Sequence, residues 1–205
     1  MIKNKFISFF LNKINILLLS FAILVNAQEV KSQSDLIKIG NDEAPVKIKV
    51  FSSLTCPHCA NFHIKVISKI KEKYITTGKV QIIFIDFPLD QAAFNASKLL
   101  HCLDESKRLV FLDKIYEDQN EWASGNDIDE INKNLKKIVK NLGINSTKFD
   151  GCLNNEVISD KILNGRINAH RKYSVDSTPT IVINEKKLDS SLNFQDIDDR
   201  IKSLI

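Results

Sequence analysis

The sequence predicts an α/β fold in which a βαβ unit and a later ββα unit build one sheet, with a block of helices inserted between them. Segments with the periodicity of strands lie near residues 35–87 and 180–189, whereas residues 90–172 between them show helical periodicity. At 205 residues and 43% hydrophobic composition, the chain is long enough for one domain with its own core.

The first part of the chain has the pattern of strand, helix and strand. Residues 35–39 are a short strand candidate, and residues 46–51 alternate apolar and polar side chains. A helix with an apolar face begins at the sequence CPHC, and Gly78 is a suitable residue to end it. The nearly all-apolar segment 80–87 is typical of a strand buried on both faces. This order predicts a right-handed βαβ unit.

A helical block follows, and its clearest amphipathic pattern spans residues 128–142. Asn126 or Asp127 can cap the start of this helix, and Gly143 ends it. The flanking helix candidates lie near residues 90–104, 107–118, 146–153 and 155–172.

Strand patterns return after the block. Residues 180–184, TIVIN, predict a strand that is followed by a turn near Glu185, a short strand at 187–189 and a closing helix over 193–204. We therefore expect four parts along the chain: residues 1–27, 28–89, 90–172 and 173–205.

The first of these parts has the pattern of a secretory signal peptide. Three lysines and an apolar run over residues 16–25 precede the sequence Val25-Asn26-Ala27, which fits a cleavage site. We expect cleavage after Ala27 and export of the chain. An uncleaved membrane anchor is the alternative, although a spanning helix of about 20 residues would contain one of the lysines.

Composition excludes one class of partner. Cleavage would leave 26 basic and 25 acidic residues, so the exported chain would be nearly neutral. It would lack the net positive charge that is typical of nucleic-acid-binding proteins. All four cysteines, Cys56, Cys59, Cys102 and Cys152, lie in this part. Disulfides persist outside the cytosol, and four cysteines allow three connectivities.

The pair Cys56 and Cys59 encloses Pro57 and His58, and it fits three kinds of site. A zinc site usually needs a second CxxC pair or paired histidines, which the sequence lacks, so we expect no metal. A structural disulfide across so short a loop would constrain little chain entropy. The pattern favours the third interpretation, a redox-active pair.

Local physical chemistry supports this interpretation. Because Cys56 lies between a strand and a helix, the unpaired N–H groups and dipole of the helix N-terminus stabilise its thiolate. Stabilising the reduced form makes the disulfide form an oxidant. His58 adds to this effect as a donor, or is a solvated loop histidine. Cys59, one turn into the helix, is expected to be the buried partner sulfur.

A second conspicuous segment, Ser177-Thr178-Pro179-Thr180, precedes the strand at 180–184. A proline that opens a strand costs no ladder hydrogen bond. Cis peptide bonds are essentially confined to proline, but a trans bond is the ordinary expectation here.

CPHC after an apolar strand, a helical block, and Thr178-Pro179-Thr180 before another apolar strand together resemble the DsbA family of bacterial thiol–disulfide oxidoreductases, over nearly all of residues 35–205. The resemblance implies a thioredoxin fold with an inserted helical domain. It also implies that Cys56 exchanges disulfides, that Cys59 resolves them, and that Pro179 is cis beside the active site. The Thr178 backbone would pair with the substrate.

The same resemblance implies a monomeric periplasmic enzyme without a cofactor, which donates disulfides to exported proteins that contain cysteines. A membrane protein of the DsbB type would reoxidise it. An isomerase or reductase of the same fold is one alternative. Another is a periplasmic chaperone or binding module in which the cysteine pair is inert.

The sequence departs from the family in one respect. Many members carry a glutamate in the strand before CxxC, but VKIKVFSSLT contains no acid. Asp86 is the nearby candidate for a buried proton shuttle, unless it is a strand-end acid that reaches solvent. The histidines at 63, 101 and 170 have no ligand spacing, so packing or surface roles are expected.

Cys102 and Cys152 lie in the helical block, fifty positions apart. In an exported chain they are expected to pair, and relatives with cysteines at such places carry a second disulfide there. Two buried free thiols are the alternative.

Overall fold

The computed structural model describes residues 36–189 and 191–205. The predicted signal peptide and its cleavage site at Ala27 therefore lie outside the described residues. Within the described residues, no helix combines the length and apolarity needed to cross a membrane.

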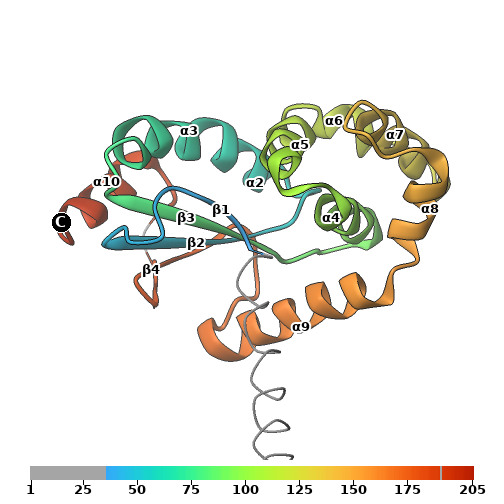
Figure 1. Ribbon diagram of the computed structural model, residues 1–205. Helices are drawn as coiled ribbons and strands as arrows, with labels where there is room; N and C mark the ends of the chain where they lie inside the picture. Colours follow the sequence, from blue (N-terminus) through green and yellow to red (C-terminus); the bar gives the residue numbers. More distant parts are fainter. Residues whose placement is uncertain (1–35, 190) are drawn as a thin grey trace, which may run out of the picture. The chain divides into compact units, whose positions relative to one another are not determined.

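A five-stranded mixed sheet forms the centre of the described chain (Figure 1). Its order is β1-β3-β2-β4-β5, and only the pair β2 and β3 is parallel. The strands are β1 (Ile37–Ile39), β2 (Val46–Ser52), β3 (Val80–Asp86), β4 (Thr180–Ile183) and β5 (Lys186–Lys187). The strands after the helical block thus join the sheet begun before it, as the thioredoxin fold requires.

The crossover between β2 and β3 is one continuous helical stretch with changing geometry. It consists of α2 (Pro57–Phe62), the π-helical turn η2 (His63–Ile67), α3 (Ser68–Ile70) and a second π-helical turn, η3 (Lys71–Ile75). Its predicted apolar face is buried. The sequence pattern did not indicate the two π-helical turns, because the apolar spacing fits an α-helix as well.

Six helices form the block between β3 and β4. They are α4 (Gln91–Cys102), α5 (Glu105–Glu117), α6 (Gln119–Trp122), α7 (Ile128–Lys140), α8 (Ser146–Leu153) and α9 (Glu156–Tyr173). Asp127 caps α7 by accepting from the Glu130 N–H at 2.8 Å, which decides between the two predicted caps. The short helix α6 has no counterpart among the predicted elements, since four residues are too few to show a period.

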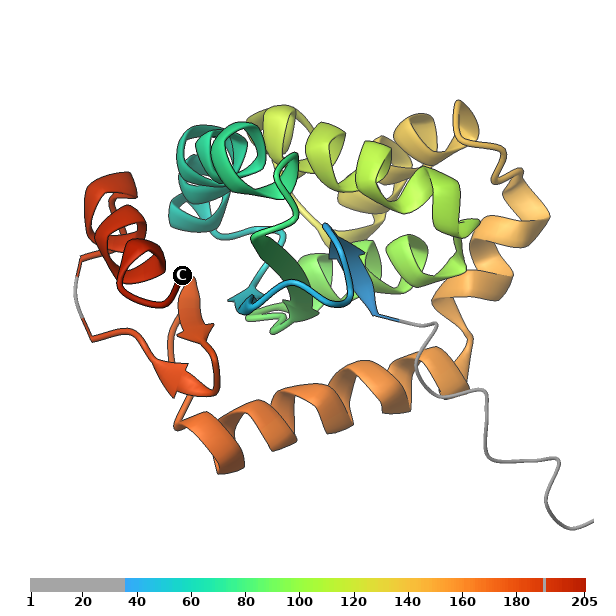
Figure 2. The same ribbon diagram turned by 60° about the vertical axis from the view of Figure 1, so that its left-hand side comes forward.

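Helices cover both faces of the sheet. In Figure 1, α3 and α10 (Phe194–Lys202) lie above the sheet and α9 crosses below it, and Figure 2 shows the same separation from the side. The larger core joins the inner positions of β2 and β3 to the crossover helix, α4, α5 and α10. A smaller cluster includes Phe51, Ala169 and Val182 on the other face.

The final hairpin begins earlier than predicted. β5 starts at Lys186 instead of residue 187, and residues 188–189 are not strand. Asn184 and Glu185 have φ values of 45° and 66°, so they form a tight two-residue turn. The pairing of β4 with β5 therefore begins directly after the turn, between Ile183 and Lys186.

The closing helix α10 is attached through a buried carboxylate. Asp198, 2% exposed, accepts from Tyr74 Oη at 2.6 Å, Lys73 Nζ at 2.7 Å and Lys202 Nζ at 2.6 Å. Burial raises its pKa, but the hydrogen bonds from Lys202, Lys73 and Tyr74 outweigh burial and hold the pKa well below the usual 3.8.

We expect Asp198→Asn to lower the free energy of unfolding by about 1–3 kcal/mol, because Tyr74 and the lysines lose a charged acceptor. The lowered pKa means that this stabilisation is present above pH 3.8 and is lost as the pH falls towards the folded-state value. Urea unfolding at pH 7 and at lower pH measures both effects. Asp199→Asn, at a carboxylate that is 61% exposed, is the matched control and should change little.

Candidate active site

Cys56 and Cys59 lie where β2 passes into the crossover helix. Cys56 is the N-cap residue of α2, with extended backbone, and Pro57 occupies the first turn, where a missing N–H costs no helical bond. The Cys56 carbonyl accepts from the Cys59 and Ala60 N–H groups at 3.0 and 3.1 Å. The strand and the helix therefore fix the position of both sulfurs.

The two sulfurs differ in their surroundings. Cys56 is 8% exposed and Cys59 only 2%, and both carry free thiols. Pro57 and His58 between them are exposed. Cys56 is thus the more accessible of the two residues, and Cys59 is the more deeply buried.

The loop before β4 closes over the same site. The Thr178–Pro179 peptide bond is cis. The Sγ of Cys56 lies 3.4 Å from the main-chain oxygen of Thr178 and donates to it. Two segments more than 120 positions apart in sequence thereby meet at one sulfur.

Burial governs the chemistry of the inner cysteine. Desolvation raises the pKa of Cys59 to about 12, against the lowering effects of the Thr178 side chain and the Ser53 backbone. The nearby Cys56 raises it further. Cys59 therefore holds its proton at neutral pH and becomes a nucleophile only when that proton is removed.

This shift predicts the alkylation behaviour of the inner thiol. In Cys56→Ser, the iodoacetamide reaction of Cys59 should be far slower than that of a peptide cysteine at neutral pH. Its rate should rise steadily with pH and show no plateau near 9, because the pKa is about 12. Mass spectrometry of quenched samples follows the reaction. A plateau near pH 9 in the native protein would contradict the raised pKa.

A glutamine that the sequence did not single out supports the cysteine loop. Gln119, 5% exposed and in α6, donates from Nε2 to the main-chain oxygens of Leu54 at 2.8 Å and Cys56 at 3.1 Å. A lone glutamine in a short helix carries no sequence signal, so only the fold reveals this contact.

Asp86 ends β3 on the side of the sheet that faces α4. Its carboxylate accepts from Ser97 Oγ at 2.6 Å and pairs with His101 Nε2 at 2.7 Å. The Asp86 side chain is 11% exposed, so the alternative of a strand-end acid in solvent is wrong. His101 thus has a largely buried partner in Asp86, whereas the partner of His63 is Asp113, which lies at 2.7 Å and is 45% exposed.

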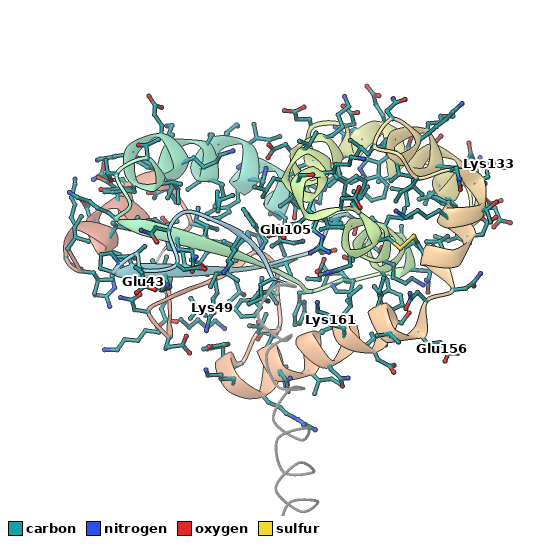
Figure 3. All side chains as sticks on the ribbon, viewed as in Figure 1. Glu43, Lys49, Glu105, Lys133, Glu156 and Lys161 are labelled. Carbon is teal, nitrogen blue, oxygen red and sulfur yellow. A yellow bond between two sulfur atoms is a disulfide. The ribbon has the colours of Figure 1, made fainter. Side chains whose placement is uncertain are left out.

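The other two cysteines are bonded to each other. Cys102, at the end of α4, and Cys152, in α8, form a disulfide that links positions fifty apart, with their Cα atoms 6.0 Å apart (Figure 3). This leaves Cys56 and Cys59 as the remaining pair. Among the described residues, no group of three His, Cys, Asp or Glu side chains is arranged to hold a metal ion.

Comparison with known proteins agrees with this geometry. A family model described as Thioredoxin matches residues 31–203. A probable disulfide bond formation protein D of Bacillus anthracis is 29% identical over 164 residues, which cover 76% of this chain and 73% of the relative. A putative protein-disulfide oxidoreductase of Rickettsia bellii is 27% identical over 132 residues, covering 64% of this chain and 49% of that protein.

Solved structures show the same likeness. α-DsbA1 of Wolbachia pipientis has a TM-score of 0.76 and 29% identity, and the match covers 84% of this chain and 92% of that one. For oxidised BdbD of Bacillus subtilis the TM-score is 0.72, with 21% identity and coverage of 84% and 94%, which shows a shared fold. The chain therefore belongs to the thioredoxin family, and it is a thiol–disulfide oxidoreductase of the DsbA type.

Proposed function

We propose that this protein donates disulfides to exported proteins through Cys56 and Cys59, in the periplasm and as a monomer. The observation that carries the proposal is the asymmetry of the pair. Cys56 lies at the helix start beside the Thr178 carbonyl, whereas Cys59 is buried with a raised pKa. In such a pair, one sulfur is accessible to partner proteins and the other stays buried and protonated.

The exchange proceeds in two displacements. A substrate thiolate attacks Cys56 Sγ of the Cys56–Cys59 disulfide, which breaks the bond between the two sulfurs and releases Cys59 to take up a proton. A second substrate thiolate then attacks the substrate sulfur of the mixed disulfide and releases Cys56 as the thiolate. The substrate loses two electrons and gains a disulfide, and the protein gains those electrons as a reduced pair.

Three local features support these roles. The helix N-terminus favours negative charge on Cys56 when it is the leaving group. His58 is exposed two positions after Cys56, and we assign it the role of an additional donor to this sulfur. The main chain at Thr178 and cis-Pro179 borders the same sulfur, and we assign it the pairing with the substrate strand.

The proposal needs a reoxidant, which must be a disulfide or quinone-linked oxidant outside the cytoplasm. A membrane protein of the DsbB type fits this requirement. The test equilibrates the Cys56–Cys59 pair with glutathione buffers and follows the oxidation of a reduced unfolded protein. A donor equilibrates as a couple more oxidising than glutathione. A couple as reducing as that of thioredoxin, about −270 mV, would instead indicate a reductase.

A further inference from the structure

The side-chain amide of Gln119 joins the helical block to the loop that carries Cys56. Gln119 is 5% exposed, and its Nε2 lies 2.8 Å from the main-chain oxygen of Leu54 and 3.1 Å from that of Cys56. An amide nitrogen carries two hydrogens, so each carbonyl group accepts one of them. Two carbonyl oxygens thus converge on one donor group, and the buried position of Gln119 keeps solvent from competing with it.

The turn before α2 sets the conformation of Cys56. The Cys56 N–H donates to the main-chain oxygen of Ser53 at 3.1 Å, and Cys56 has the extended backbone of an N-cap residue, with φ −78° and ψ 118°. The Cys56 carbonyl group is the first acceptor of α2, since Cys59 and Ala60 donate to it. A donor from another element that binds this carbonyl group therefore holds the residue in the geometry in which a helix N-terminus stabilises negative charge.

The same amide changes the electrostatic surroundings of the Cys56 sulfur. A peptide carbonyl oxygen carries partial negative charge, and an N–H that points at the oxygen offsets this charge. Full negative charge develops on Cys56 when this sulfur leaves as a thiolate. If Gln119 had no donors, two carbonyl oxygens near Cys56 would lack this compensation. The reduced form would then be less stable, whereas the uncharged disulfide form would change little.

We propose that Gln119 is a positioning residue for disulfide exchange, which holds Cys56 at the start of α2 and increases the oxidising power of the Cys56–Cys59 disulfide. The inference rests on the proposed function, because it takes Cys56 as the sulfur that leaves as the thiolate. Gln119 itself gains and loses no proton or electron in this step. Since Gln119 lies in α6, 63 positions after Cys56, the helical block takes part in setting the redox chemistry of the pair.

The first test replaces Gln119 by methionine, which has a similar length and no donor. The variant Gln119→Met is equilibrated with glutathione buffers, and alkylated samples are analysed by mass spectrometry for the ratio of oxidised to reduced protein. The equilibrium constant for oxidation of glutathione by the protein should fall about tenfold, which corresponds to about 30 mV for a two-electron couple. The loss has this direction because the missing hydrogen bonds favour the thiolate form.

A second measurement separates this role from that of a purely structural support. Urea unfolding is followed for the oxidised and the reduced form of each protein. Gln119→Met should lower the stability of the reduced form more than that of the oxidised form, because only the reduced form carries the thiolate. A structural support would lower both stabilities equally and leave the equilibrium with glutathione unchanged.

Gln81→Met is the matched control. Gln81 is 3% exposed and donates from Nε2 to the carboxylate of Asp42. It lies near the start of β3, whereas the cysteines follow the end of β2, which pairs with the end of β3. Gln81→Met should therefore lower the stability of both redox forms by the same amount and leave the equilibrium with glutathione unchanged.

Two further variants vary the chemistry at position 119. Gln119→Glu has nearly the same shape, but its ionised carboxylate has no donor and adds negative charge. It should lower the equilibrium constant further than Gln119→Met at pH 7, and the difference should shrink in acid, where a protonated carboxyl group can donate. Gln119→Asn keeps the amide on a shorter side chain that cannot reach both oxygens, so it should give a smaller fall. This variant decides the question if Gln119→Met does not fold.

An equilibrium constant within about twofold of wild type for Gln119→Met, or equal losses of stability in both redox forms, would overturn the positioning role. The same holds for Gln119→Asn where it replaces the methionine variant. If the wild type failed to oxidise a reduced unfolded protein, the proposed function would be wrong. The equilibrium with glutathione would still decide on Gln119, because it needs no protein substrate.

Discussion

Cys56→Ser is expected to lose disulfide exchange completely, whereas Cys59→Ser is expected to accumulate a mixed disulfide. A serine hydroxyl at position 56 cannot form the bond to a substrate sulfur. In Cys59→Ser the outer sulfur still reacts with a disulfide-bonded peptide, but the sulfur that would displace the peptide is gone. Non-reducing electrophoresis and intact-mass measurement detect the adduct, and peptide mapping places it on Cys56.

The matched control for this result is the double variant Cys102→Ala and Cys152→Ala. These cysteines form their own disulfide within the helical block, so the variant should still exchange disulfides through Cys56. An adduct located on any other residue, or oxidation of the substrate by Cys56→Ser, would contradict the assigned roles. Full biological function of a variant lacking both Cys56 and Cys59 would favour a binding module instead.

Loss of the Cys102–Cys152 disulfide is expected to lower the free energy of unfolding by about 4 kcal/mol in the chain-entropy model. The bond links positions 50 apart in the sequence. In this model it stabilises the folded state because the closed loop has less conformational entropy in the unfolded chain. Guanidinium unfolding of the Cys102→Ala and Cys152→Ala double variant measures the difference from wild type.

This measurement should be made with Cys56 and Cys59 both replaced by serine, so that their redox state does not contribute. Dithiothreitol-treated protein that retains Cys102 and Cys152 is the second control, because it breaks the bond without leaving cavities. A loss below about 1 kcal/mol in both samples would mean that the unfolded chain is already compact across this loop.

The strands and helices that the sequence predicted well are those whose periodicity is set by burial. The segments at 46–51 and 80–87 have apolar residues at the positions that face the core, and they form β2 and β3 in the structure. The amphipathic spacing over 128–142 corresponds to α7. Among the elements that were missed or shifted, α6 and the start of β5 are too short for a period to show, and the π-helical turns η2 and η3 keep an apolar spacing that fits an α-helix as well.

In the candidate site, too, the sequence predicted the positions that depend on neighbouring residues and not the contacts between distant segments. The sequence by itself placed Cys56 at a helix start and Cys59 one turn inward, because neighbours along the chain fix both positions. Thr178 and cis-Pro179 were expected beside the cysteines only through the family resemblance, and Gln119 under the cysteine loop was not expected at all, since both contacts depend on how distant segments pack.

The sequence determined the chemistry of this protein, because a CxxC pair at a strand-to-helix junction is a local feature that needs no distant partner. Only the tertiary structure decided the surroundings of that pair: the burial that raises the pKa of Cys59, the partners of Asp86, and the contact of the Gln119 amide with the Cys56 carbonyl group. The physical reason is that desolvation and hydrogen bonding depend on which atoms surround a group in space, whereas periodicity records only which faces of each element are covered.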